Sequence, residues 1–249
     1  MSINSILFEI RDMFDQRCEE VKRYFEFLSN VEHAKANTIA KYNAASGESI
    51  VYYSETISRE LIKTLRANGY LLLYNLVEST LTNAIDGIHR SFLQDNECDF
   101  DRLRDEIKKI VLSNFKKAIG RDEYSRGEYQ THPIARSVME WGYDKKSLFS
   151  GNLDGRTIKK EADRYGFSIA EHDLSATRDG ARLLVVKTKR NELAHGQISF
   201  EECGQEISLD ELMAISEETT IYLDAVLRGV EDYVESKAYY NTRESALIP

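Results

Sequence analysis

The sequence has very little proline, few cysteines and no long apolar run. Only two prolines occur in 249 residues, Pro133 and the terminal Pro249, so almost nothing interrupts helices. The three cysteines, Cys18, Cys98 and Cys203, are too few and too far apart for a disulfide framework or a metal site. We therefore expect a helical protein that folds without disulfides in a reducing cytoplasm.

Signatures of membrane proteins, exported proteins and several enzyme classes are also missing. No apolar stretch is long enough to span a bilayer, and charged residues come too early at the N-terminus for a signal peptide. The histidines show no metal-ligand spacing, no Gly-x-Ser-x-Gly motif occurs, and residues 151–155 lack the lysine of a phosphate-binding loop. We expect no membrane contact, no metal and no cofactor.

The periodicity of apolar residues predicts an all-α bundle. Apolar residues recur at three- and four-residue steps from Ile3 to Leu28, as in a long amphipathic helix. A connection at residues 34–53 follows, with a short strand possible at residues 50–53. We divide the chain into this N-terminal helix with its connection (residues 1–53) and a helical domain (residues 54–249), and expect one compact unit.

Periodicity and capping residues predict the other helices. The segment 54–92 is helical with either a break or a bend at Asn68-Gly69, and residues 70–92 are apolar enough to lie at the centre. Further helices are expected at residues 100–119, 134–141 and 155–165, after Ser175, and after a capping box at Ser208–Glu211. Residues 121–153 have weak periodicity and are predicted to be an insertion that shapes or covers a site.

The helix expected after Ser175 carries an unusual residue in its apolar seam. Leu183, Val186 and Leu193 have the spacing of a core-facing stripe, and Arg190 occupies the position in it where a leucine would be expected. An arginine in such a seam can satisfy a buried carboxylate, or it can bind an anionic ligand.

Two polar residues accompany Arg190 at the end of this helix. Asn191 and His195 are four residues apart and share a face, and Gly196 is a suitable residue to end the helix. Arg190 and His195 point roughly 140° apart around an ideal helix. They converge only if the arginine wraps around the helix or if two copies of the helix meet.

The net charge of −9 argues against nucleic acid, but the charge is unevenly distributed. Residues 178–196 contain five basic side chains and two carboxylates, whereas residues 201–235 contain eleven carboxylates and one arginine. The basic segment is compatible with a phosphate-bearing ligand. From charge alone, a solvated basic face is the simpler interpretation.

One carboxylate falls among the core positions of the central helix. Glu78 shares an inward stripe with Tyr74 and Leu81, and a buried carboxylate requires a partner or a raised pKa. We expect Glu78 to pair with or orient Arg190 or Lys187; a purely structural ion pair is equally consistent with the pattern.

The stretch Arg190-Asn-Glu-Leu-Ala-His195 resembles the Arg-Asn-x-x-x-His motif of the HEPN superfamily. These α-helical domains include ribonucleases of toxin–antitoxin and antiviral defence systems. The similarity covers roughly residues 55–235 and implies a HEPN-like antiparallel helical bundle, here with an additional N-terminal long helix. Some HEPN toxins have a tyrosine two residues after the histidine, as the target of a modifying antitoxin. Gln197 occupies that position here, so this mode of neutralisation is not expected.

The resemblance implies metal-independent RNA cleavage by a homodimer, at a composite site where two copies of the motif meet. His195 would act as general base on the ribose 2′-hydroxyl or as acid on the departing oxygen, and Arg190 would stabilise the phosphate. Asn191 would orient His195 or bind the ribose, and Lys187 and Lys189 would guide the RNA backbone. An antitoxin or defence-system protein is a possible further partner.

Two other functions remain open on the sequence. A HEPN-fold scaffold or RNA-binding protein would have the same bundle without cleaving RNA. A helical dimerisation module would use the apolar seam of the N-terminal helix as its working surface.

Overall fold

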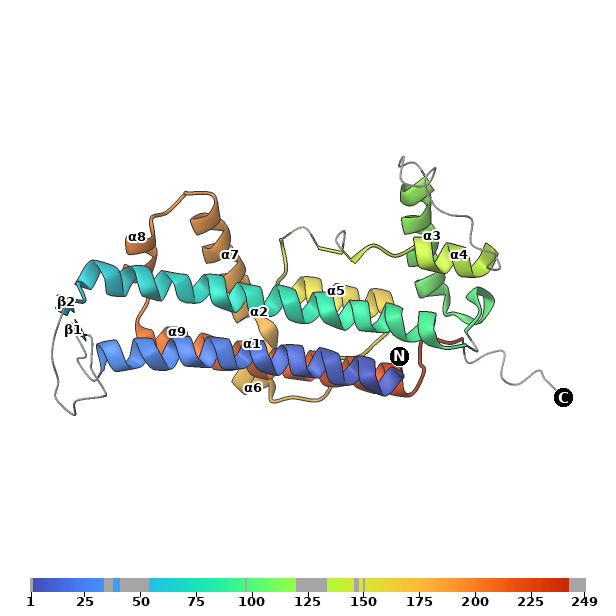
Figure 1. The fold of residues 1–249 in the computed structure, drawn as a ribbon, viewed down its shortest axis with the longest axis horizontal. Helices are drawn as coiled ribbons and strands as arrows, with labels where there is room; N and C mark the ends of the chain where they lie inside the picture. The colour runs from blue at the N-terminus through green and yellow to red at the C-terminus, as the bar shows by residue number, and fades with distance from the viewer. Residues whose placement is uncertain are drawn as a thin grey trace, which may run out of the picture.

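A computed structural model describes residues 2–33, 38–40, 54–96, 98–119, 134–145, 148–149 and 151–241. Its centre consists of three long helices, α1 (Ile3–Glu32), α2 (Arg59–Gln94) and α9 (Leu209–Glu235), which lie side by side (Figure 1). The predicted all-α class is confirmed for this part of the chain. A two-stranded antiparallel ribbon, formed by β1 (Thr38–Ala40) and β2 (Ser54–Thr56), was not predicted.

Helix α1 confirms the predicted amphipathic N-terminal helix. Ser2 caps it by accepting a hydrogen bond from the backbone N–H of Ser5. Arg11 binds α9 through Asp224 at 2.6 Å and Glu231 at 2.7 Å. The apolar face of α1 packs against α2 and α9 in one continuous hydrophobic cluster with the helices that follow; its buried residues are Ile6, Leu7, Ile10, Phe14, Val21, Phe25, Leu28 and Val31.

Helix α2 is the central helix, as predicted, in contact with α1, α7, α8 and α9, and it passes through Asn68-Gly69 without a break. Gly69 lies where both neighbouring helices approach α2. A Cβ atom at this position would lie 2.8 Å from Leu212 of α9 and 3.1 Å from Phe25 of α1. The glycine therefore permits close packing of the three helices, which offsets its low helix propensity.

The region between α2 and α5 differs from the prediction at one helix start. A single 3₁₀ turn, η1 (Phe100–Arg102), precedes α3 (Asp105–Ile119), so the helix predicted from residue 100 begins later. Helix α4 (Ile134–Trp141) and α5 (Gly155–Tyr165) confirm the predicted segments. The possible strand at residues 50–53 and, within the predicted insertion, residues 121–133, 146–147 and 150 lie outside the described residues.

The predicted cap at Ser175 was wrong. Asp173 caps a short helix, α6 (Leu174–Thr177), by accepting hydrogen bonds from Ser175 and Ala176. A 3₁₀ turn, η4 (Arg178–Gly180), then leads to α7 (Arg182–Ala194), which has no side-chain N-cap. The helix with the Arg190 motif therefore begins after a tight turn and not at a serine cap.

The capping box predicted at Ser208 is only half formed. Ser208 accepts a hydrogen bond from the backbone of Glu211, but the Glu211 carboxylate lies 3.4 Å from Arg182 of α7. A complete capping box occurs instead at Ser199 and Glu202, at the start of α8 (Phe200–Gln205). The ion pair between α7 and α9 has therefore replaced the second bond of the predicted box.

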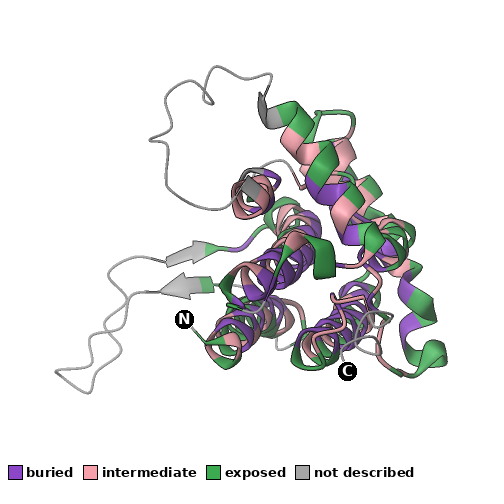
Figure 2. Ribbon diagram, turned by 90° about the vertical axis from the view of Figure 1, so that its right-hand side faces the viewer, coloured by how far each residue is buried: buried purple, intermediate pink, exposed green. Residues whose placement is uncertain are grey.

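Buried residues lie on the faces that the helices turn toward one another (Figure 2). Among the described helices, none is long and apolar enough to cross a membrane. In Figure 1, α7 and α8 project above α2, while α1 lies below it. The turn between α7 and α8 is consequently at an outer edge of the molecule.

Candidate functional site

Helix α7 holds the candidate site against the central helix. Its predicted seam is confirmed, because Leu183, Val186 and Leu193 are buried and pack on the core. Arg190 occupies the remaining seam position and is half-buried. The apolar residues thus fix the rotation of α7 on α2, and this rotation sets the direction of Arg190.

The C-terminal end of α7 is a Schellman turn. The N–H of Gly196 donates to the carbonyl of Leu193 at 3.2 Å, and the N–H of Gln197 donates to the carbonyl of Glu192 at 2.8 Å. Gly196 has a φ of 65°, in the left-handed region, and no atom lies within 4 Å of where its Cβ would be. The predicted helix end is confirmed, and the turn faces open space.

His195 is at this end of α7 and is exposed. Its imidazole makes no hydrogen bond with any residue that the structure describes, and the Asn191 amide hydrogen-bonds with Arg190 and Asn152. An exposed imidazole at an open turn is accessible to a ligand or to a second copy of the chain. Its catalytic role stays a prediction.

The guanidinium of Arg190 is held by an aromatic ring and an amide. Its central carbon lies 4.4 Å from the centroid of the Tyr74 ring, and Nη1 donates to Oδ1 of Asn191 at 2.9 Å. Burial raises the pKa of Tyr74, so the phenol stays neutral. Within the described part of the chain Arg190 has no carboxylate partner.

A tight turn before α5 closes over Arg190; it begins at the end of the segment 121–153, which was predicted to shape or cover a site. Gly151 has a φ of 79°, and a Cβ there would lie 3.4 Å from Nη1 of Arg190. Asn152 accepts a long hydrogen bond of 3.4 Å from Asn191, and the N–H of Leu153 donates to the Tyr74 hydroxyl at 3.2 Å. The glycine-containing segment 151–155 lacks a P-loop lysine and contacts Arg190 and Asn191 instead.

Lys187 is engaged by the same turn. Its Nζ lies 2.5 Å from Oδ2 of Asp154, which also caps α5 by accepting from the N–H of Thr157 at 2.9 Å. Burial would raise the pKa of Asp154, but the hydrogen bonds from Lys187 and Thr157 outweigh it and lower that pKa. This ion pair joins α7 to α5 beside Arg190.

Lys189 also lies between intrachain carboxylates. Its Nζ is 3.0 Å from Glu192 and 2.7 Å from Glu206. Hydrogen bonding to Glu206 raises the pKa of Lys189 above its usual value. The prediction that Lys187 and Lys189 guide RNA stays a prediction, and each has a carboxylate partner in the free protein.

Glu78 does not form the ion pairs that the sequence predicted for it. It is half-buried on α2 and forms no ion pair with a described residue, whereas Lys187 pairs with Asp154. The expected pairing with Arg190 or Lys187 was therefore wrong. The apolar stripe correctly predicted which face of α2 is turned inward. The partner of Lys187, Asp154, lies in a turn far away in the sequence, so the periodicity of α2 could not predict it.

The described residues contain no group of three or more His, Cys, Asp or Glu side chains that could hold a metal ion. Arg190, Asn191, Tyr74 and the 151–154 turn instead form a small cationic site, and His195 follows at the C-terminal end of the same helix. The guanidinium is suited to binding an oxyanion, and the imidazole is a group that can transfer a proton.

Comparison with known proteins identifies the family. No curated protein and no solved structure is significantly similar to the chain. The model of the MAE_28990-like HEPN family matches residues 6–239, which include most of α1 as well as the motif on α7. Because this match covers almost the whole chain, the protein belongs to the MAE_28990-like HEPN family.

Proposed function

We propose that this protein is an endoribonuclease that cleaves RNA without a metal ion, through attack of the ribose 2′-hydroxyl on the adjacent phosphate. Its biological role in this proposal is that of a toxin or antiviral defence effector. Membership of a HEPN family supports a ribonuclease or nucleotide-binding role in general. The finer assignment rests on the site at the end of α7.

The observation that carries the proposal is the half-buried Arg190 charge, which lacks a carboxylate partner among the described residues. A partly desolvated charge is unfavourable unless it is compensated. The Tyr74 ring and the Asn191 amide compensate only part of it, and the guanidinium keeps N–H donors for a ligand. A phosphate matches this requirement, because its oxygens accept two parallel hydrogen bonds from a guanidinium.

His195 supplies the proton transfers in this proposal. An imidazole can take the proton from the 2′-hydroxyl, which then attacks phosphorus and expels the 5′-oxygen of the next nucleotide. The products are a 2′,3′-cyclic phosphate and a 5′-hydroxyl after a proton is returned to the leaving oxygen. Arg190 stabilises the negative charge that grows on the phosphate in the transition state. DNA lacks the 2′-hydroxyl and is not a substrate.

A second copy of the chain completes the site in this proposal. One imidazole cannot be both base and acid in the same step, and the open turn at Gly196 leaves His195 accessible to a symmetry-related α7. In such a homodimer one His195 acts as base and the other as acid. Subunits that meet at the two α7 ends also enclose both Arg190 side chains in one groove.

The direct test is incubation of the purified protein with total cellular RNA in the presence of excess EDTA. We expect cleavage, with 2′,3′-cyclic phosphate ends detected by end-specific ligation. An oligonucleotide with a single 2′-deoxy substitution at a mapped cut site should remain intact there. Cleavage that requires a divalent metal, or that leaves 5′-phosphate ends, would contradict the proposed reaction.

His195→Ala is the decisive variant, and His33→Ala is its matched control. His33 is also an exposed histidine at a helix end, but it lies on α1 beside Asp210. We expect His195→Ala to slow cleavage about a hundredfold or more and His33→Ala to leave it unchanged.

Expression in bacteria tests the proposed toxic role. Growth arrest by the wild type and normal growth with His195→Ala are expected. Equal growth, together with intact RNA in the purified assay, would favour a non-cleaving scaffold or RNA-binding protein.

A further inference from the structure

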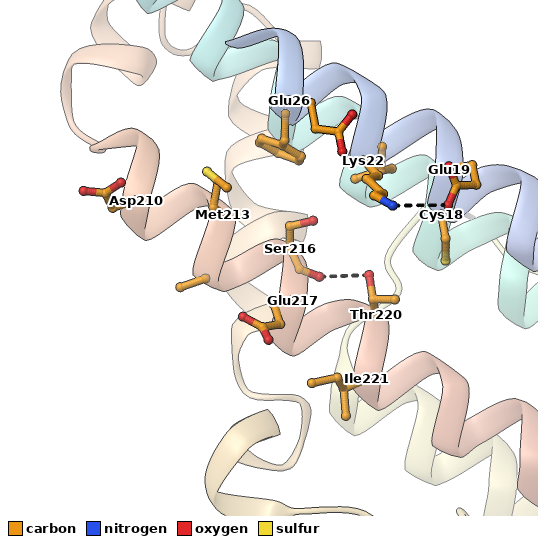
Figure 3. A pocket seen from close by; sticks show the side chains of 13 residues that line it. Cys18, Glu19, Lys22, Glu26, Asp210, Met213, Ser216, Glu217, Thr220 and Ile221 are labelled. Carbon is orange, nitrogen blue, oxygen red and sulfur yellow. Dashed lines mark hydrogen bonds and ion pairs between the residues drawn. The ribbon is translucent and has the colours of Figure 1, made fainter. Parts of the chain in front are cut away.

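A groove of about 790 Å³ lies between α1 and α9 (Figure 3). Val21 and Phe25 of α1 form buried parts of its wall, while Met213 and Ile221 of α9 leave 39% and 36% of their surfaces exposed. Met213 and Ile221 therefore give the groove an exposed apolar surface on which side chains of another protein can pack.

The two helices present matching stripes to the groove. Met213, Glu217 and Ile221 follow one another at four-residue steps on α9, so they share one face. Cys18 and Lys22 have the same relation on α1. Burial raises the pKa of Cys18 to about 12, so its thiol stays protonated and acts as an apolar surface. The result is an apolar channel with acidic side chains along it.

The net charge of the groove is negative. Among the described residues that line it, the carboxylates are Glu19, Glu26, Asp210 and Glu217. Lys22 is the one cationic side chain in this lining, and it is paired with Glu19 at 3.8 Å. A ligand that enters therefore meets uncompensated negative charge beside apolar surface.

We propose that this groove binds an amphipathic helix of a partner protein, with an apolar face and basic residues along its edges. Apolar side chains of that helix pack on Met213 and Ile221, and its lysine or arginine side chains pair with Glu26, Asp210 and Glu217. The part of α9 that lines the groove, residues 210–221, is about 17 Å long at 1.5 Å per residue. It accommodates about three turns of a helix.

The negative charge of the groove also argues against RNA and against a second copy of the chain as its occupant. RNA would bring phosphates against four carboxylates, so the groove and the cationic site on α7 bind different ligands. A second copy that docked by two-fold symmetry through the same groove would bring the same carboxylates together. A basic partner has neither problem.

The test uses the full chain and a fluorescein-labelled synthetic helix of leucine and lysine, about 14 residues long, with leucine on one face. We expect saturable binding by fluorescence anisotropy. A peptide with the same composition but scrambled order, and an amphipathic helix with glutamate in place of lysine, should each bind at least about tenfold more weakly. Equal binding of either peptide would overturn the proposal, because the groove requires both the apolar face and the charge.

Two variants locate the binding site. Ala214 is an exposed lining residue, and Ala214→Arg fills the groove and reverses its charge locally. Ala176→Arg introduces the same side chain at an exposed position on α6, outside the groove, and is the matched control. We expect Ala214→Arg to weaken binding at least about tenfold, Glu217→Lys to weaken it as well, and Ala176→Arg to have no effect.

Equal affinity for wild type and Ala214→Arg would overturn the proposal, provided that both have the same circular dichroism spectrum. If Ala214→Arg misfolds, Glu217→Lys, which changes only an exposed side chain, decides in its place. Sedimentation velocity tests whether the groove binds a second copy of the chain instead of a partner helix. Self-association that Glu217→Lys or Ala214→Arg abolishes would assign the groove to a second copy and overturn the proposed partner.

Discussion

The guanidinium carbon of Arg190 lies 4.4 Å from the centre of the Tyr74 ring, and this contact joins the motif on α7 to the central helix α2. The Tyr74 hydroxyl also accepts the N–H of Leu153, so one side chain supports both Arg190 and the turn that closes over it. Tyr74 is therefore a positioning residue for the proposed reaction.

Substitution of Tyr74 should separate the roles of its ring and its hydroxyl. Tyr74→Leu removes the cation–π contact with Arg190, and we expect kcat for RNA cleavage to fall about tenfold. A tenfold fall in rate corresponds to a loss of about 1.4 kcal/mol in transition-state stabilisation. Tyr74→Phe retains the ring and should lose much less. Steady-state kinetics on a short RNA measure both variants, with thermal melting to verify folding. Equal rates for Leu and Phe would show that the ring does not position Arg190.

A mixture of wild type and His195→Ala tests whether the site is shared between subunits. After subunit exchange with a large excess of His195→Ala, most wild-type chains lie in mixed dimers, and each such dimer retains one His195. We expect cleavage per wild-type chain to fall as the variant is added, because the proposed reaction uses one His195 as base and the other as acid. Undiminished cleavage by a verified mixed dimer would contradict a site that is shared between subunits.

Gly151 and Gly166 form a matched pair for testing the turn over Arg190. Both have positive φ, 79° and 82°, so alanine at either position should cost about 1 kcal/mol in folding free energy. A Cβ at Gly151 would meet Arg190, whereas one at Gly166 would meet Arg104, away from the site. We expect a small loss of thermal stability for Gly151→Ala, a loss at least as large for Gly166→Ala, whose Cβ would lie 2.8 Å from Arg104, and a loss of RNA cleavage only for Gly151→Ala. A comparable loss of cleavage for Gly166→Ala would attribute the effect to stability alone.

Buried His89 should make the protein sensitive to mild acid. Its Nε2 is 3.0 Å from the Tyr165 hydroxyl and its ring stacks on Tyr143 at 4.0 Å. Burial, with a smaller contribution from Arg164, lowers the pKa of His89 from 6.5 to about 3. At pH values between these two pKa values, His89 binds a proton in the unfolded chain but not in the folded protein. The contribution of neutral His89 to the free energy of unfolding is therefore fully present above pH 6.5 and falls as the pH is lowered toward 3.

Urea unfolding at several pH values measures this effect. When the unfolding free energy is plotted against pH, the contribution of His89 to the slope approaches about 1.4 kcal/mol per pH unit midway between the two pKa values. His89→Phe fills the same apolar site without a titrating group, and its unfolding free energy should depend less steeply on pH between 6 and 4. Identical slopes for the two proteins would contradict the lowered pKa. Comparison at pH 8 provides the control, since His89 is neutral there in both states.

Much of this protein follows from local sequence patterns. The amphipathic α1, the apolar α2 and the end of α7 at Gly196 were predicted correctly, because burial of one helix face and the φ requirement of a C-terminal turn are visible at short sequence range. The motif from Arg190 to His195 was found for the same reason. Its residues lie within two turns of one helix, and an arginine in an apolar seam stands out without any knowledge of the fold.

The tertiary structure decided which side chains surround that motif. The sequence predicted that Glu78 pairs with or orients Arg190 or Lys187, but the partner of Lys187 is Asp154, because the turn before α5 packs against α7 across a long stretch of chain. From the sequence, Gly69 was compatible with a break or a bend in the helix. The structure shows that α2 is continuous there and that Leu212 and Phe25 leave no room for a larger side chain. Helical periodicity tells which face of a helix is buried. Only the packed chain determines what lies against that face, since such contacts depend on segments far apart in sequence.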